Sequence, residues 1–169
     1  MGTARQIKLI TAILFCLAAA AAWAQFVSKS PHSQSAEKTE AVQYLYPEQL
    51  TLPVGKSTPV GLHFRVAQGL HINSHKPSDD YLIPTEFSIP ENAGVRMESA
   101  NYPQGTNMTL PADPNTHLNV YTGNFAIQTR LIAQPGDHLV KGKLHYQACD
   151  QTQCMPPKTI TVAIDVIGK

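Results

Sequence analysis

The sequence predicts an all-β protein, an immunoglobulin-like antiparallel β-sandwich, and three observations lead to that fold class. Short runs rich in β-branched and aromatic residues recur from residue 42 onward, separated by Pro, Gly, Asn and Asp. No stretch carries a sustained helical period of apolar residues. About eight such runs in roughly 125 residues have the spacing of antiparallel sandwiches, which favours a sandwich over a closed barrel.

The first 24 residues have the pattern of a secretory signal peptide. A positively charged start is followed by an apolar run at 9–21 and by an A-x-A cleavage motif that ends at Ala24. The apolar run is shorter than the roughly 20 residues that a membrane-spanning helix needs, so cleavage is favoured over an uncleaved anchor. The mature protein is therefore expected outside the cytoplasm, in the periplasm of a bacterium.

Residues 25–41 are rich in Ser, Lys, Glu and Gln and contain little to bury, which predicts a flexible linker. A single domain at 42–169 follows. The formal net charge is +1 with acids and bases interspersed, so neither nucleic acid nor an anionic membrane surface is an expected partner. No phosphate-binding loop or Ser-His-Asp order stands out, and no small-molecule cofactor is expected.

Within the domain, each expected strand is bounded by turn-forming residues. The turn signals PVGK, QGLH, ENAG and QPGD separate successive apolar runs. The last run alternates from Ile160 to Val166 and, with the run before it, predicts a hairpin that carries CDQTQCMPP across its tip. The segment 102–124, with three prolines and two glycines, is expected to be a long polar loop. The expected strands are 43–52, 58–67, 70–72, 85–89, 95–99, 125–133, 138–148 and 158–167.

Cleavage after Ala24 would remove Cys16 and leave Cys149 and Cys154, an even count that is expected to pair in an oxidising compartment. The pair allows three interpretations. As a structural staple it would close a loop so short that it contributes only about 2 kcal/mol, against nearly 5 kcal/mol for a loop of a hundred residues. As a metal clamp it lacks a complete ligand set even with His145 and Met155 nearby, and no metal is expected.

The third interpretation is reversible thiol:disulfide exchange, because a disulfide at an exposed tip is reachable by an attacking thiolate. Pro156 stiffens the exit from the tip, so Cys154 is expected to be more accessible than Cys149, which ends a strand. The carboxylate of Asp150 opposes a thiolate on its neighbour Cys149. Cys154 is therefore expected to exchange with a partner, and Cys149 to resolve the mixed disulfide.

The stretch LHYQACDQTQCMPPKTITVAIDV, preceded by GLHINSHKPSDDYLIPTEFSIP, resembles the N-terminal periplasmic domain of the thiol:disulfide interchange protein DsbD over residues 42–166. The resemblance implies an immunoglobulin-like sandwich in which Cys149 and Cys154 form the redox pair, led into by Tyr146 and Gln147 and followed by Pro156. In that family the pair relays electrons from a membrane-embedded donor and its thioredoxin-like partner to periplasmic proteins of disulfide isomerisation or cytochrome c maturation.

The resemblance also implies a cap over the pair, which by position is residues 103–119 and includes Pro103, Met108 and Asp113. His71 and Asn73 occupy the place of the family's active-site tyrosines and are expected neighbours of the pair, the alternative being strand residues on a polar face. Three departures stand out: the cysteines are one residue closer together, the acidic cluster of the cap is missing, and the sequence ends at Lys169. The electron donor is therefore expected to be a separate membrane protein.

Together these observations predict a periplasmic module that exchanges disulfides with thioredoxin-fold partners through Cys149 and Cys154, a protein-disulfide oxidoreductase acting as a carrier. The alternative is a non-enzymatic envelope binding module in which the disulfide is structural. A reduction potential below about −300 mV would favour the structural bridge, and a higher potential the carrier.

Overall fold

The computed structural model describes residues 40–45, 49–111 and 113–169. The predicted signal peptide (1–24) and most of the predicted linker (25–41) lie outside the described residues, as does the side chain of Asp113. Strands account for all the regular structure of the described residues, in which no helix is long and apolar enough to cross a membrane. The strands are β1 (Val42–Leu45), β2 (Gln49–Leu52), β3 (Thr58–Val66), β4 (His71–Asn73), β5 (Glu86–Ser88), β6 (Val95–Asn101), β7 (Thr106–Leu110), β8 (Asp113–Tyr121), β9 (Asn124–Ala133), β10 (Gly136–Tyr146), β11 (Ala148–Cys149) and β12 (Lys158–Gly168).

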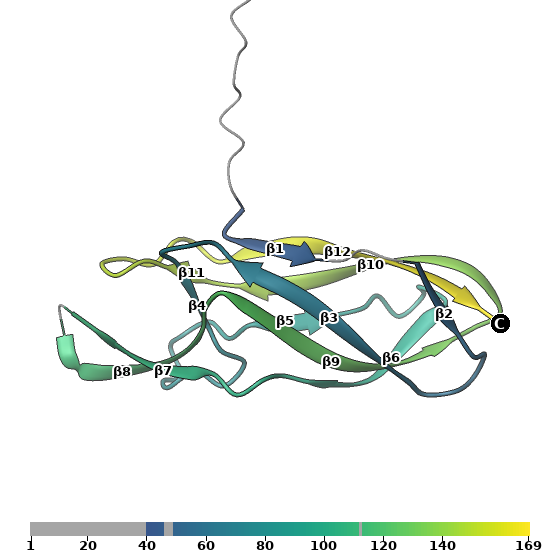
Figure 1. Ribbon diagram of the computed structural model, residues 1–169, viewed down its shortest axis with the longest axis horizontal. Coiled ribbons are helices and arrows are strands. Elements are labelled where there is room, and N and C mark those ends of the chain that lie inside the picture. The colour runs from purple at the N-terminus through teal and green to yellow at the C-terminus, as the bar shows by residue number, and fades with distance from the viewer. Residues whose placement is uncertain (1–39, 46–48, 112) are drawn as a thin grey trace, which may run out of the picture. The chain divides into compact units, whose positions relative to one another are not determined.

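Two four-stranded sheets form the sandwich. One has the strand order β1-β3-β9-β6 and the other β2-β12-β10-β5; Figure 1 shows β3 beside β9 and β10 beside β12. Buried and exposed residues alternate along β3, β10 and β12, so each sheet turns one apolar face inward. Phe64 and Ile127 from the first sheet and Leu144 and Ile164 from the second belong to one buried cluster. The predicted immunoglobulin-like sandwich is confirmed.

The predicted single strand at 43–52 is wrong, because the structure divides it between the two sheets. β1 pairs antiparallel with β3, whereas β2 pairs parallel with β12, so the sandwich is not purely antiparallel. Pro47 lies in the interval between the two strands, and proline has no N–H with which to continue a ladder. The segment contributes one edge strand to each layer.

The predicted long polar loop at 102–124 is also wrong, because it contains the hairpin β7–β8. With β4 and β11 this hairpin builds a third sheet of order β11-β4-β8-β7. Leu118 and Val120 of β8 alternate with polar neighbours and are buried, as expected for a strand with one covered face. The prolines that suggested a loop lie at the turn, before β7, and near the start of β8.

The predicted C-terminal hairpin is confirmed. β10 and β12 pair antiparallel through eleven residue pairs, from Gly136 opposite Gly168 to Tyr146 opposite Lys158. Beyond this ladder the chain leaves the sandwich sheet, and β11 pairs with β4 in the third sheet instead. The hairpin tip therefore belongs to a different sheet from the strands that carry it.

Candidate functional site

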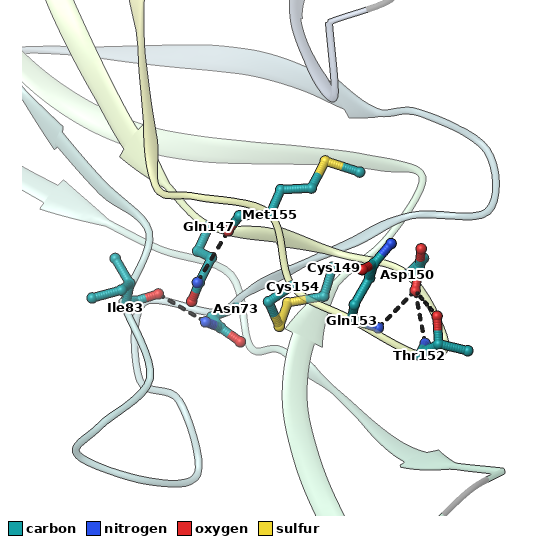
Figure 2. The surroundings of a disulfide bond; sticks show 9 residues. All are labelled: Asn73, Ile83, Gln147, Cys149, Asp150, Thr152, Gln153, Cys154 and Met155. Carbon is teal, nitrogen blue, oxygen red and sulfur yellow. Dashed lines mark hydrogen bonds between the residues drawn. A yellow bond between two sulfur atoms is a disulfide. The ribbon is translucent and has the colours of Figure 1, made fainter.

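Cys149 and Cys154 are joined by a disulfide at the tip of the β10–β12 hairpin, as Figure 2 shows. The two residues lie directly opposite each other in an isolated antiparallel bridge, with Cα atoms 3.9 Å apart. On either side, the Met155 N–H donates to the Ala148 carbonyl at 2.8 Å and the Asp150 N–H donates to the Gln153 carbonyl at 2.9 Å. The cysteines are thus a non-hydrogen-bonded pair, the type that brings facing side chains closest. The predicted pairing of the two cysteines is confirmed.

Asp150 shapes the loop between the cysteines. Its Oδ1 accepts hydrogen bonds from the Thr152 N–H at 2.7 Å, from the Thr152 hydroxyl at 2.8 Å and from the Gln153 N–H at 2.8 Å (Figure 2). Hydrogen bonds from the backbone of Thr152 and Gln153 hold the pKa of Asp150 below its ordinary value, because they favour the charged form. The carboxylate therefore organises a tight Asx-type turn that presents the disulfide.

The two cysteines differ in exposure. Cys149 is 3% exposed, whereas Cys154 is exposed, as are Met155 and Pro156 after it. The residue that a partner can approach from solution is therefore Cys154, while Cys149 is enclosed by the protein. The predicted difference in accessibility is confirmed; the roles of the two cysteines in exchange stay a prediction.

Tyr146 and Gln147 connect the tip to the core. Tyr146 ends β10 as a buried core residue, and burial raises the pKa of its phenol. Gln147 is half-buried, and its Nε2 donates to the Met155 carbonyl at 3.1 Å, a bond that links the two sides of the hairpin (Figure 2). Both residues support the base of the tip.

His71 and Asn73 are strand residues of β4 and are buried, 4% and 1% exposed, so they do not lie on a solvent-exposed face. His71 lies opposite Cys149 in the ladder between β4 and β11. Asn73 donates from Nδ2 to the Ile83 carbonyl at 3.0 Å, and its own carbonyl accepts a hydrogen bond from the Thr85 hydroxyl (Figure 2 draws the first bond). Asn73 thus fastens the segment before β5, while His71 is the cross-strand neighbour of the redox pair.

The predicted cap, residues 103–119, is mostly the β7–β8 hairpin and does not cover Cys154, which is exposed with the hairpin in place. β4 lies between β8 and β11 in the third sheet. Met108 of β7 is half-buried and lines an open pocket of about 600 Å³ together with His71 and Gln151. Pro103 accepts a hydrogen bond through its carbonyl, and the backbone of Asp113 begins β8. Of the predicted cap residues whose side chains are described, Met108 shares a pocket with the disulfide loop and Pro103 does not.

Sequence reasoning missed a cluster of rings that attaches the β7–β8 hairpin to the rest of the domain. The His75 ring stacks on Tyr102, with centroids 3.7 Å apart and planes 6° from parallel. The Tyr121 hydroxyl accepts from the His75 N–H at 3.1 Å and donates to the Pro103 carbonyl at 2.9 Å. Burial raises the pKa of both Tyr102 and Tyr121. The two tyrosines, which lie near the two ends of the segment 102–124 that was predicted to be a loop, were the signal for an ordered attachment.

In the described part of the chain, no three His, Cys, Asp or Glu side chains gather in positions that could hold a metal ion. What the site offers chemically is a disulfide between one exposed and one buried cysteine. Such a bond can be opened by an incoming thiolate and closed again without rearranging the sandwich.

Comparisons with known proteins give a family and a solved structure to which the chain is similar. A family model described as "Thiol:disulfide interchange protein DsbD, N-terminal" matches residues 30–166. Among solved structures, the N-terminal domain of DsbD from Neisseria meningitidis, in the reduced form, is similar at 17% sequence identity, covering 68% of this chain and 82% of that chain with a TM-score of 0.46. No curated protein matches the chain. Because the family model covers most of the sequence, the chain belongs to the family of DsbD N-terminal domains.

Proposed function

We propose that this protein is a periplasmic thiol:disulfide interchange module that relays electrons through Cys149 and Cys154 to or from thioredoxin-fold partners. The observation that carries the proposal is the unequal exposure of the two cysteines. Cys154 is exposed beside the exposed Met155, while Cys149 is 3% exposed. A carrier needs one cysteine that a partner reaches and one that is kept from unwanted reactions, and one exposed and one buried cysteine meet this need.

The exchange follows from this arrangement. A partner thiolate bonds to Sγ of Cys154, the disulfide breaks, and its electron pair remains on Sγ of Cys149 as a thiolate. The partner's second thiol then attacks the mixed disulfide and releases Cys154. Its proton, together with one taken up from solvent in place of the proton that the attacking partner thiolate had lost, leaves both cysteines as thiols. The domain gains two electrons and two protons, and the partner becomes a disulfide. The reverse sequence returns them to an acceptor.

A purely structural role is less well supported, because the loop is already held without the bridge. The Met155–Ala148 and Asp150–Gln153 hydrogen bonds close its two ends, and Asp150 organises its turn. A crosslink over so few residues adds about 2 kcal/mol at most. The disulfide therefore adds little stability to a segment that hydrogen bonds already hold in place.

Family membership supports partners of the thioredoxin fold in general and a periplasmic location. The separate membrane electron donor stays a prediction. Reconstituting reduction of the purified protein by candidate membrane donors supplied as separate polypeptides would test it. Cell fractionation would test the location, with recovery in the cytoplasmic fraction counting against it.

The function is tested by trapping. The Cys149→Ala variant retains the exposed Cys154, and it is expected to form a mixed disulfide with a thioredoxin-fold protein whose own resolving cysteine has been replaced. The matched Cys154→Ala variant retains only the buried Cys149 and is expected to react at least about tenfold more slowly, because the thiolate must reach the partner. Non-reducing electrophoresis and mass spectrometry identify the complex.

The reduction potential of the unmodified protein completes the test. A potential above about −300 mV, with reduction by a thioredoxin, is expected of a carrier. A lower potential, together with no trapped complex, would refute the proposal in favour of a structural bridge. Faster trapping through Cys149 than through Cys154 would leave exchange intact but reverse the proposed roles.

A further inference from the structure

We propose that His71 stabilises the thiolate that forms on Cys149 when the disulfide is opened. The inference deepens the proposed function and rests on it for its biological meaning, although the chemistry requires only that the disulfide can be reduced. Neither the family match nor the predicted cap assigns this role to His71. The inference comes from the third sheet, which brings β4 against β11.

The geometry places three side chains in one row across the sheet. Cys154 lies opposite Cys149, and Cys149 lies opposite His71. Residues directly opposite each other in an antiparallel ladder project from the same face, with Cβ atoms about 5 Å apart. Because Cys149 and Cys154 are a non-hydrogen-bonded pair, the backbone N–H and C=O of Cys149 point toward β4. This orientation fixes the strand that carries His71 beside Cys149.

His71 is buried and, within the described part of the chain, has a ring nitrogen without a hydrogen-bond partner. The side chain is 4% exposed, and its Nε2 atom is buried with no hydrogen-bond partner among the described residues. Native proteins seldom leave a buried polar nitrogen unpaired, because an unmade hydrogen bond costs free energy. A disulfide sulfur is a weak acceptor, whereas the thiolate that reduction leaves on Cys149, the residue opposite His71, is a strong one. Reduction therefore supplies the partner that the oxidised site lacks.

The charges around His71 are compatible with this role. Burial lowers the pKa of His71, and the nearby Asp150 carboxylate partly opposes that effect. Arg65 of β3 lines the same pocket as His71, and its Nε donates to Asn124 at 3.0 Å. Three uncharged residues from the start of β9 and the turn before it also line that pocket: Thr122, Gly123 and Asn124. A neutral imidazole retains one N–H, so it can donate to a thiolate without placing a second charge in the buried site.

The step itself needs no further reactant. The partner thiolate bonds to Sγ of Cys154, the bond between Cys149 and Cys154 breaks, and the electron pair stays on Sγ of Cys149. The imidazole then donates a hydrogen bond from its N–H to that sulfur. Stabilising the leaving thiolate speeds its release and favours the reduced form.

Two variants separate the hydrogen bond from the bulk of the ring. In His71→Phe a ring remains without an N–H, while His71→Gln retains an amide N–H near the place of Nε2. The equilibrium constant for reduction by glutathione is expected to fall at least about tenfold in His71→Phe, which is a reduction potential lower by about 30 mV. His71→Gln is expected to remain within about threefold of the unmodified protein. His145→Phe, on β10, is the matched control and is expected to leave the constant unchanged; its imidazole bonds to Thr159 at 3.0 Å.

The acidity of Cys149 gives a readout that a merely structural role would not move. In a Cys154→Ser background, titration of the thiolate absorbance is expected to show the Cys149 pKa about one unit higher with His71→Phe than with His71. In the unmodified protein, the nitrogen NMR resonance of Nε2 is expected to move on reduction, a measurement that holds even if His71→Phe does not fold.

An unchanged resonance, or equal effects of His71→Phe and His71→Gln, would overturn the inference. Different results are expected if the proposed function, and not the role of His71, is wrong. In that case the unmodified protein traps no thioredoxin-fold partner and has a potential below about −300 mV, whereas the difference between His71→Phe and His71→Gln persists.

Discussion

Reducing the disulfide is expected to leave the domain folded and to lower its free energy of unfolding by no more than about 2 kcal/mol. Cys149 and Cys154 are only five positions apart in the sequence, so the bridge closes a very small ring. In the chain-entropy treatment, a ring of about six residues removes about 7 cal/mol/K from the unfolded chain, which is about 2 kcal/mol at 25 °C.

The folded protein gives little reason for a larger loss. The hydrogen bonds of Asp150, Gln153, Met155 and Ala148 do not involve sulfur and remain available after reduction. The sandwich core is built from other residues, and Cys154 is exposed. If His71 pairs with the reduced Cys149 as proposed, the loss will be smaller still.

Urea denaturation measures this difference when unfolding is monitored by far-ultraviolet circular dichroism, with and without a phosphine reductant. The dependence of the free energy on urea should be unchanged, since the same surface is exposed on unfolding. By a thermodynamic cycle, 2 kcal/mol corresponds to a potential about 45 mV lower in the folded than in the unfolded chain. A loss above about 4 kcal/mol, or unfolding on reduction, would refute the reasoning and identify the bridge as a structural element. The double variant Cys149→Ser with Cys154→Ser is the matched control, because it removes the bridge without reductant.

Two further predictions concern the surroundings of the site. Tyr121→Phe removes a hydroxyl that bonds to the His75 N–H and to the Pro103 carbonyl, and it is expected to lower the free energy of unfolding by about 1–3 kcal/mol. In the same urea assay the exposed Tyr81→Phe should have no effect, and equal stability of both variants would contradict the assigned hydrogen bonds. The stability that the Asp150 turn contributes is expected to depend on pH, because the pKa of Asp150 is lower in the folded state than in the unfolded chain. The carboxylate contributes its full stabilisation above the unfolded pKa of about 3.9, and this stabilisation is lost as the pH falls through the folded pKa. NMR titration of the Thr152 and Gln153 amides measures this, Asp150→Asn should abolish the dependence, and a midpoint above the unfolded value would show that the hydrogen bonds do not favour the carboxylate.

The sandwich could be predicted from the sequence because apolar and polar residues alternate along its strands and mark the buried face of each. The alternation from Ile160 to Val166 is a local signal, and it fixes both the strand and the face that turns inward. The same is true of β3 and β9, which pair across the first sheet as the expected strands 58–67 and 125–133. The hairpin tip with its two cysteines was found for the same reason, since short-range order and composition determine it.

The third sheet could not be predicted in this way, because its pairings join segments far apart in the chain. β4 is three residues long, too short for a periodic signal, and its partner β11 is shorter still. Leu118 and Val120 do alternate with polar residues, but Pro111 and Pro114 nearby indicated a loop. The burial of His71 follows from this sheet alone, so an imidazole that reads as a surface residue in the sequence is a buried neighbour of Cys149 in the structure.

The unequal exposure of the two cysteines creates a difficulty that the third sheet addresses. Burial shields Cys149 from unwanted oxidants, yet it also opposes the thiolate that must leave when Cys154 is attacked, because a buried charge is poorly solvated. The Asp150 carboxylate on the loop adds to that opposition through its negative charge. A module with a buried leaving cysteine therefore needs a hydrogen-bond donor on the β4 side of the disulfide. His71 is the residue that β4 places opposite Cys149. The short strand β4, for which the sequence carries only a weak signal, thus allows the disulfide to be shielded by burial and still to undergo exchange.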